Sequence, residues 1–205
     1  MLLSNTFIGL LFIVSVGATP LTGRQTSCST LQLVFLAGTN EEGLGLAGGP
    51  LSTNLTSAVP GTTTYSVPYD TSAEYGSTVT AGATMTVNYL TAQAASCPNQ
   101  RFALGGYSKG AMVIHSISLS STMKDKIAAI VVFGDPYRGL NNNWPIKSPV
   151  VNSNPRSGFT SSQNVASFCN GGDIVCRAGL SIPDHLEYGT NGDTAVAASF
   201  IKNHA

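Results

Sequence analysis

Residues 101–117 read RFALGGYSKGAMVIHSI, an apolar run that meets a glycine-rich turn and continues into a second apolar run. Within it, Gly106-Tyr107-Ser108-Lys109-Gly110 fits the pattern G-x-S-x-G, in which a strand turns sharply into a helix and exposes the serine oxygen. The pattern alone arises by chance in about one chain of this composition in four. Its context is more specific, because 101–106 has the pattern of a strand and 111–117 that of a helix. The stretch therefore predicts a strand–turn–helix unit with Ser108 as a candidate nucleophile.

Strands and helices alternate along the rest of the chain. Apolar or β-branched runs predict the strands, and apolar residues at helical spacing predict the helices. The expected strands cover 31–37, 62–67, 101–106, 127–133 and 165–168, and the expected helices cover 51–59, 75–97, 111–117 and 194–203. This alternation is typical of parallel strands joined by right-handed crossovers, so we expect a three-layer α/β/α sandwich with a central, mostly parallel sheet of about five strands. Residues 141–162, rich in Asn, Pro and Ser, are expected to form a long surface excursion.

Charged residues are scarce in this chain. Ten Lys and Arg balance ten Asp and Glu, so the formal net charge is zero and charged residues make up 10% of the 205 residues. No basic stripe is present, which argues against a nucleic-acid-binding protein. The hydrophobic content of 42% is enough for one globular core and excludes intrinsic disorder. Beyond residue 20, no apolar stretch is long enough to span a membrane.

The first residues have the pattern of an export signal. An apolar run from Phe7 to Val16 is followed by the small residues Gly17 and Ala18 and by Pro20. This pattern predicts a cleaved secretory signal peptide over 1–18, the alternative being a buried N-terminal helix, although no Lys or Arg precedes the run.

Cysteine usage agrees with export. The chain has four cysteines, an even number that predicts two disulfides with three possible connectivities: Cys28, Cys97, Cys169 and Cys176. Zinc sites use paired short spacings that are absent here, so no metal site is expected.

A nucleophilic serine needs a histidine as its base, and the chain has three histidines. His115 lies about 10 Å along the helix from Ser108, too far to reach it, and is interpreted as a helix-face residue. His204 is the penultimate residue, where fraying is expected. His185 is therefore the candidate base.

Orienting the imidazole of His185 calls for a carboxylate between Ser108 and His185 in the chain. Asp125 belongs to a charged turn, and Asp184 adjoins His185 too closely. The two remaining aspartates in this interval, Asp135 and Asp173, both follow expected strands. We favour Asp173, because a disulfide closing 169–176 would hold it tightly, and keep Asp135 as the alternative.

From about Cys28 to its end, the chain resembles the fungal cutinases, a secreted branch of the α/β-hydrolases that also includes acetylxylan esterases. The matching pieces are Gly105-Gly106-Tyr107-Ser108, Phe168-Cys169-Asn170 with Gly172-Asp173, and His185-Leu186 with Tyr188-Gly189. The resemblance implies one α/β-hydrolase domain over 28–205, ester hydrolysis without a cofactor, and a catalytic triad of Ser108, Asp173 and His185. It also implies the disulfides Cys28–Cys97 and Cys169–Cys176.

The resemblance further implies an oxyanion hole formed by Thr39 and the backbone N–H of Lys109. Cutinases usually have Gln at the position of Lys109, and Ser is common at that of Thr39. Because the donor at position 109 is main-chain, the exchange should spare the hole, although a cation near the oxyanion could alter the rate and its pH dependence. The interval from Ser108 to Asp173 is longer than in typical cutinases, so 141–162 is the least transferable region.

The substrate is expected to be lipidic or polymeric. Leu180, Ile182 and Leu186 bracket His185, and Leu44 and Leu46 follow Thr39, so these leucines and isoleucine are candidate apolar lips for acyl or polyester chains. Core packing is the alternative for each of them. We expect a secreted, monomeric esterase for cutin, other polyesters and short acyl esters. The alternatives are an acetylxylan esterase, which would need a polar rim, and a non-catalytic, elicitor-like secreted protein.

Overall fold

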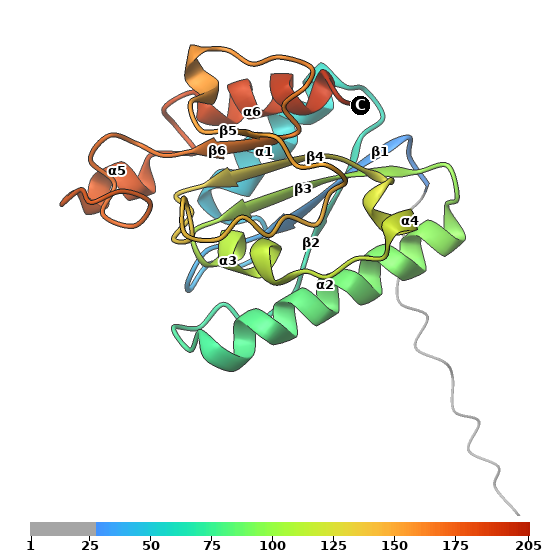
Figure 1. Ribbon diagram of the computed structural model, residues 1–205, viewed down its shortest axis with the longest axis horizontal. Coiled ribbons are helices and arrows are strands. Elements are labelled where there is room, and N and C mark those ends of the chain that lie inside the picture. The colour runs from blue at the N-terminus through green and yellow to red at the C-terminus, as the bar shows by residue number, and fades with distance from the viewer. Residues whose placement is uncertain (1–27) are drawn as a thin grey trace, which may run out of the picture.

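The computed structural model describes residues 28–205, and the signal peptide predicted over 1–18 lies outside them. Strands and helices alternate as expected from the sequence (Figure 1). The strands are β1 (Leu31–Leu36), β2 (Thr63–Ser66), β3 (Arg101–Tyr107), β4 (Ile127–Phe133), β5 (Val151–Asn152) and β6 (Val165–Phe168). The helices are α1 (Gly45–Ala58), α2 (Gly76–Ser96), α3 (Lys109–Ser116), α4 (Ser121–Lys124), a 3₁₀ turn η1 (Pro155–Ser157), α5 (Ile182–Leu186) and α6 (Asp193–Lys202).

The strands form a six-stranded sheet in the order β2-β1-β3-β4-β6-β5, and every pairing in it is parallel. All residues of β1 and β4 are buried, because helices cover both faces of a parallel sheet. This explains why these two strands are continuous apolar runs in the sequence. The sheet has one strand more than the approximately five expected.

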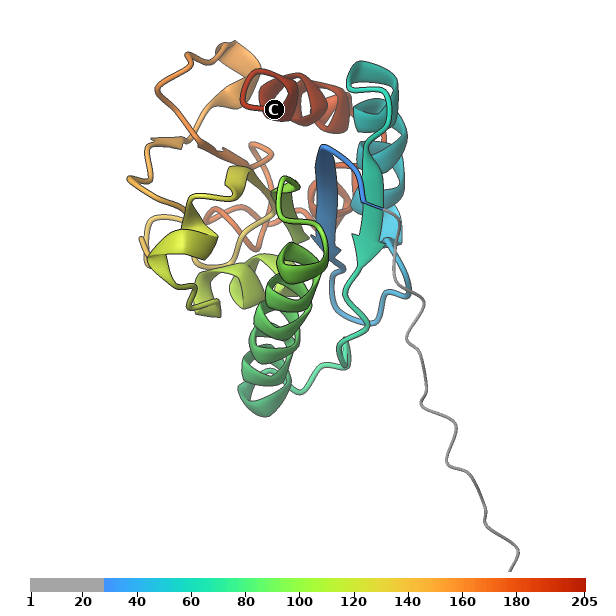
Figure 2. The ribbon, with the colours of Figure 1, turned by 90° about the vertical axis from the view of Figure 1, so that its right-hand side faces the viewer.

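Successive side chains of a strand point to opposite faces of the sheet, so they pack into the two different hydrophobic cores. Leu33 and Phe35 pack beneath α1 and α6, whereas Val34 and Leu36 pack against α2 and α3. Figure 2 shows α1 and α6 on one side of the sheet and α2 and α3 on the other. The three-layer α/β/α sandwich is confirmed.

Several elements differ from the expectation, and among them the short helices α4 and α5 lie where no helix was predicted. The helix expected at 51–59 begins six residues earlier, at Gly45, and includes Pro50. The 141–162 segment contains β5, a strand of only two residues that pairs with the start of β6. A two-residue strand is too short to produce a recognisable periodicity, so nothing in the sequence could indicate it.

Parallel strands bring their carboxyl ends to one edge of the sheet. The segments that follow β1, β3, β4 and β6 all start at this edge, and α5 lies beyond the ends of the arrows in Figure 1. These segments carry Thr39, Ser108, Asp135 and Asp173. Side chains far apart in the sequence can therefore meet here.

Candidate active site

Ser108 occupies the turn between β3 and α3 in a strained backbone conformation, with φ of 51° and ψ of −115°. A Cβ at Gly110 would overlap the carbonyl oxygen of Leu36, and one at Gly106 would lie 2.8 Å from the carbonyl carbon of Gly110. Both positions thus require glycine for the close approach of α3 to the sheet. The Ser108 side chain is half-buried, so its hydroxyl remains accessible.

The structure brings Ser108, His185 and Asp173 into one hydrogen-bonded line. His185 Nε2 lies 3.0 Å from Ser108 Oγ, and His185 Nδ1 lies 2.8 Å from Asp173 Oδ2. With Nδ1 donating to the carboxylate, Nε2 is free to accept the serine proton. Asp173 is wholly buried and His185 nearly so, which keeps water from competing for these hydrogen bonds.

The segments that carry Asp173 and His185 are tied together. The backbone N–H of Ser181 donates to the carbonyl of Gly172 at 2.9 Å, and the Ser181 hydroxyl caps α5 by accepting from the N–H of Asp184. The Tyr107 hydroxyl donates to the carbonyl of His185 at 2.8 Å. The imidazole is therefore held by its own short helix and by β3.

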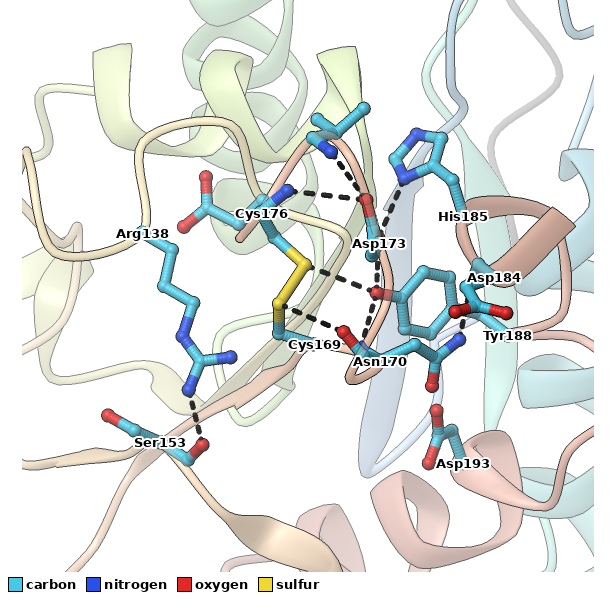
Figure 3. Close-up of a disulfide and its surroundings, with 12 residues drawn as sticks. Arg138, Ser153, Cys169, Asn170, Asp173, Cys176, Asp184, His185, Tyr188 and Asp193 are labelled. Atoms are coloured by element: carbon cyan, nitrogen blue, oxygen red, sulfur yellow. Dashed lines mark hydrogen bonds and ion pairs between the residues drawn. A yellow bond between two sulfur atoms is a disulfide. The ribbon is translucent and has the colours of Figure 1, made fainter. Parts of the chain in front are cut away.

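Tyr188 supports the buried carboxylate. Its hydroxyl donates to Asp173 Oδ2 at 2.6 Å, and the N–H of Val175 donates to Oδ1 at 2.6 Å (Figure 3). Burial by itself would raise the pKa of Asp173, but the hydrogen bonds from Tyr188, His185 and Val175 outweigh burial and hold it below its usual value. Burial also raises the pKa of Tyr188, so its hydroxyl stays protonated and keeps donating.

Tyr188→Phe should weaken this support without removing the carboxylate. A hydrogen bond to a charged group contributes about 1.5–3 kcal/mol, and we expect the free energy of unfolding at pH 7 to fall by about that amount. Without this donor the pKa of Asp173 rises towards its usual value, so the stability that the ionised carboxylate contributes should be lost at a higher pH as the solution is acidified. Urea unfolding of both proteins at pH 7 and over a series of acidic pH values measures the two effects, and an identical pH dependence of stability would contradict the role of Tyr188 as a donor to Asp173.

Two disulfides join Cys28 to Cys97 and Cys169 to Cys176, as the resemblance implies. The first links residues 69 apart in sequence and the second residues 7 apart. Figure 3 shows the smaller loop beside Tyr188, with the Asp173 carboxylate between Tyr188 and His185. The N–H of Cys176 also donates to Asp173 Oδ1.

The two disulfides should therefore fail differently. Cys28→Ser with Cys97→Ser opens a long loop and should cost about 4 kcal/mol of stability while leaving the folded enzyme active. Cys169→Ser with Cys176→Ser opens a short loop, and a short loop constrains the unfolded chain less, so the loss of stability should be smaller. This pair of changes nevertheless loosens the segment that positions Asp173. We expect the second pair to lose activity out of proportion to its loss of melting temperature. Equal ratios of activity loss to stability loss in the two pairs would exclude a positioning role for the small loop.

The other two histidines lie elsewhere. His115 is buried on the inner face of α3, where Nε2 lies 2.9 Å from Asp135 Oδ2 and Nδ1 lies 3.1 Å from the carbonyl oxygen of Asn143. Its ring also packs against the ring of Trp144, with centroids 4.0 Å apart and the planes tilted by 44°. His115 is thus a helix-face residue that anchors the 141–146 segment, and the alternative acid, Asp135, is paired with it rather than with His185.

His204 is far from the site. Its carbonyl accepts from Arg101, the first residue of β3, whereas Ser108 follows the last residue of that strand. The two residues therefore lie at opposite edges of the sheet.

Thr39 and Lys109, the residues expected to form the oxyanion hole, lie on the segments that follow β1 and β3. Thr39 follows β1, and its Oγ1 shares a hydrogen bond of 2.9 Å with the hydroxyl of Tyr75. Lys109 is the first residue of α3, so its backbone N–H lies at a helix N-terminus, where such groups have no partner within the helix. The Lys109 side chain is wholly buried and donates to backbone carbonyls of the loop before α2.

The apolar residues next to His185 in the chain are exposed. Leu180, Ile182 and Leu186 are 92%, 60% and 54% exposed, and Ile174, which sequence reasoning missed, is 46% exposed. Leu44 and Leu46 instead are half-buried and pack against the core beneath α1, which is the core-packing alternative. Tyr188 was also not singled out as a functional residue, because its role depends on a contact with Asp173 that no spacing reveals.

Within 28–205, the structure contains no group of three or more His, Cys, Asp or Glu side chains that could hold a metal ion. None of the helices in this part of the chain is long and apolar enough to cross a membrane.

Sequence comparison identifies related proteins. The chain matches the family model described as Cutinase over residues 27–205. It is 33% identical over 199 residues to carboxylesterase Culp1 of Mycobacterium tuberculosis, which covers 94% of this chain and 89% of that protein. It is 32% identical over 187 residues to a cutinase of Monilinia fructicola, which covers 87% of this chain and 85% of that protein.

Solved structures share the fold. A Trichoderma reesei cutinase in complex with a phosphonate inhibitor superposes with a TM-score of 0.70 at 27% identity, covering 85% of this chain and 75% of that one. The catalytic core domain of a Trichoderma reesei acetylxylan esterase gives a TM-score of 0.70 at 20% identity, over 87% of this chain and all of that one, which is a likeness of fold alone. The architecture is therefore that of a cutinase-like α/β-hydrolase. From its family match and its relatives, the chain belongs to the cutinase family and is a carboxylic ester hydrolase.

Proposed function

We propose that the protein is a serine esterase in which Ser108 is the nucleophile, His185 the general base and Asp173 the orienting acid. The observation that carries this proposal is the continuous line of hydrogen bonds from Asp173 through His185 to Ser108, with distances of 2.8 and 3.0 Å. The strained turn at Ser108 adds support, because it presents the hydroxyl at the edge of the sheet.

In this mechanism Ser108 Oγ attacks the ester carbonyl carbon while His185 Nε2 takes the hydroxyl proton. Buried Asp173 stabilises the imidazolium that forms, and the N–H of Lys109 together with Thr39 stabilises the oxyanion. The imidazolium then gives its proton to the leaving alcohol, and an acyl group remains on Ser108. Water, deprotonated by His185, hydrolyses the acyl-enzyme and restores the serine.

We further propose that the preferred substrates are polyesters such as cutin and short-chain acyl esters. Leu180, Ile182 and Leu186 support this, because an exposed apolar rim of this kind suits a lipidic or polymeric chain. An acetylxylan esterase is the alternative activity, and a polar rim would have favoured it.

Release assays on short acyl esters, cutin and acetylated xylan test the substrate class. We expect hydrolysis of the first two, with Leu180→Ser plus Ile182→Ser lowering cutin release much more than hydrolysis of a soluble acetyl ester. Deacetylation of xylan at the higher rate, unaffected by this pair of changes, would favour the alternative. A phosphonate probe that fails to label Ser108 would favour a non-catalytic, elicitor-like protein.

Export to the extracellular space is part of the same proposal. The two disulfides support it, because such bonds persist in oxidising compartments. N-terminal sequencing of protein recovered from culture medium should give a start after Ala18 or near Gln25.

A further inference from the structure

The side chain of Lys109 is in an unusual position for a lysine. It is 0% exposed, although it immediately follows the accessible Ser108. Its ammonium donates to three backbone carbonyls, those of Asp70 at 2.9 Å, Ser72, and Glu74 at 3.0 Å. An ammonium group has three N–H donors, so its hydrogen-bonding capacity is filled.

The surroundings of Lys109 compensate for the burial of its charge. Nζ lies 5.6 Å from the ring centroid of Tyr69 and 5.3 Å from that of Tyr75, distances typical of cation–π contacts. We call residues 70–75 the carbonyl loop, since three of its alternate carbonyls converge on one cation. A side chain with fewer N–H donors, such as glutamine, would leave at least one of these carbonyls without this donor.

The carbonyl loop in turn holds the segment that contains Thr39. The carbonyl of Thr71 accepts from the N–H of Asn40 at 2.8 Å, and the Thr71 hydroxyl donates to the carbonyl of Glu41 at 2.8 Å. The Tyr75 hydroxyl is hydrogen-bonded to Thr39 Oγ1 at 2.9 Å. The loop that surrounds the Lys109 ammonium therefore contacts three successive residues, 39 to 41.

We propose that the Lys109 side chain is a positioning residue, whose ammonium orders the carbonyl loop and thereby sets Thr39 in place for the oxyanion. One residue then supplies a backbone donor to the oxyanion and fixes the location of the second donor. The inference rests on the proposed function, because Thr39 matters in this way only if it faces the oxyanion.

The charge on Lys109 makes this arrangement sensitive to alkaline pH. Burial lowers the pKa of Lys109, and the nearby carboxylates of Asp70 and Glu74 oppose that effect. The other titratable groups that face the ammonium are the phenols of Tyr69 and Tyr75. Loss of the Lys109 proton removes one donor from the carbonyl loop, so kcat should fall at alkaline pH.

Lys109→Met tests the inference by keeping most of the length of the side chain while removing the ammonium group and its charge. We expect kcat on a soluble short-chain ester to fall about 10²-fold at neutral pH, as for loss of one oxyanion donor, with KM little changed. The alkaline fall due to Lys109 should be absent in this variant. Lys202→Met, at an exposed position on α6, is the matched control and should leave kcat unchanged.

A double-mutant cycle separates positioning from general destabilisation. Tyr75→Phe removes the hydroxyl contact with Thr39, and combining it with Lys109→Met should lower kcat by less than the product of the single effects, because both act through Thr39. Multiplicative losses in the double variant, or an unchanged kcat in Lys109→Met, would overturn the inference.

If Lys109→Met folds poorly, chemical rescue of a smaller variant tests the same inference. In Lys109→Ala, n-propylammonium replaces the missing atoms and should restore part of kcat, whereas neutral n-propanol should not. Equal effects of the two compounds would also overturn the inference. Ser108→Ala is assayed in parallel, since its retained activity would refute the proposed function itself, whereas an inactive Ser108→Ala beside a fully active Lys109→Met would refute only the role of Lys109.

Discussion

Ser108→Ala should fold normally and lose about 10⁶-fold in kcat for ester hydrolysis. The substitution removes the nucleophilic hydroxyl that lies 3.0 Å from His185 Nε2, and the groups of a triad act as a unit. The variant can still bind the ester and stabilise the oxyanion, so a small rate of hydrolysis above the uncatalysed rate in water should remain. The substitution removes one oxygen from a half-buried position, so the melting temperature should change little.

The measurement combines initial rates with a covalent probe. A phosphonate should label the wild-type protein at residue 108 and should leave Ser108→Ala unlabelled. Ser116→Ala, an exposed serine at the end of α3, is the matched control and should keep both activity and labelling. If clean Ser108→Ala still turned over esters, another nucleophile would carry the reaction.

The sheet was largely predictable from the sequence because most of its strands are buried on both faces. The predicted bounds of β4 and β6 agree with the structure, and those of β4 are clear because it is an apolar run between Lys126 and Gly134. The start of α1 could not be predicted, because Gly45, Gly48, Gly49 and Pro50 disfavour a helix and only packing against the sheet and α6 overrides them. Local propensity thus located the longer elements but not α4, α5 or β5, and tertiary contacts decided where the elements end.

The site was predictable as far as chain order constrains it. Elimination left His185 as the base, and the structure places its ring next to Ser108. The choice between Asp135 and Asp173 depended on which histidine each aspartate contacts. That in turn depends on how α3, which carries His115, and α5, which carries His185, are oriented against the sheet. The direction of the Lys109 side chain could not be predicted either. Its partners are backbone carbonyls, and because every residue has one, no residue type in the sequence indicates them.

Asp173→Asn should leave a folded protein whose kcat is lower by about 10⁴-fold. The amide can still occupy the buried site, but it cannot stabilise the imidazolium that forms when His185 takes the serine proton. It can also donate to His185 Nδ1, which would place the ring proton on Nε2 and block acceptance from Ser108. Tyr188 and the N–H groups of Val175 and Cys176 would lose an ionised acceptor, so some stability should be lost as well.

Asp135→Asn is the matched control, because Asp135 is an equally buried aspartate that is paired with a histidine at the same edge of the sheet. Its partner His115 faces acceptors at both ring nitrogens, namely Asp135 and the carbonyl of Asn143, so in the described part of the chain these two groups take the place that Ser108 has beside His185. This change should therefore lower the melting temperature by loosening the 141–146 segment while the folded fraction keeps its kcat. Rates per folded molecule, from unfolding curves and active-site titration of both variants, make the comparison. If Asp135→Asn proved the crippling change and Asp173→Asn the mild one, the acid of the reaction would be Asp135, and the hydrogen bond between Asp173 and His185 would be structural only.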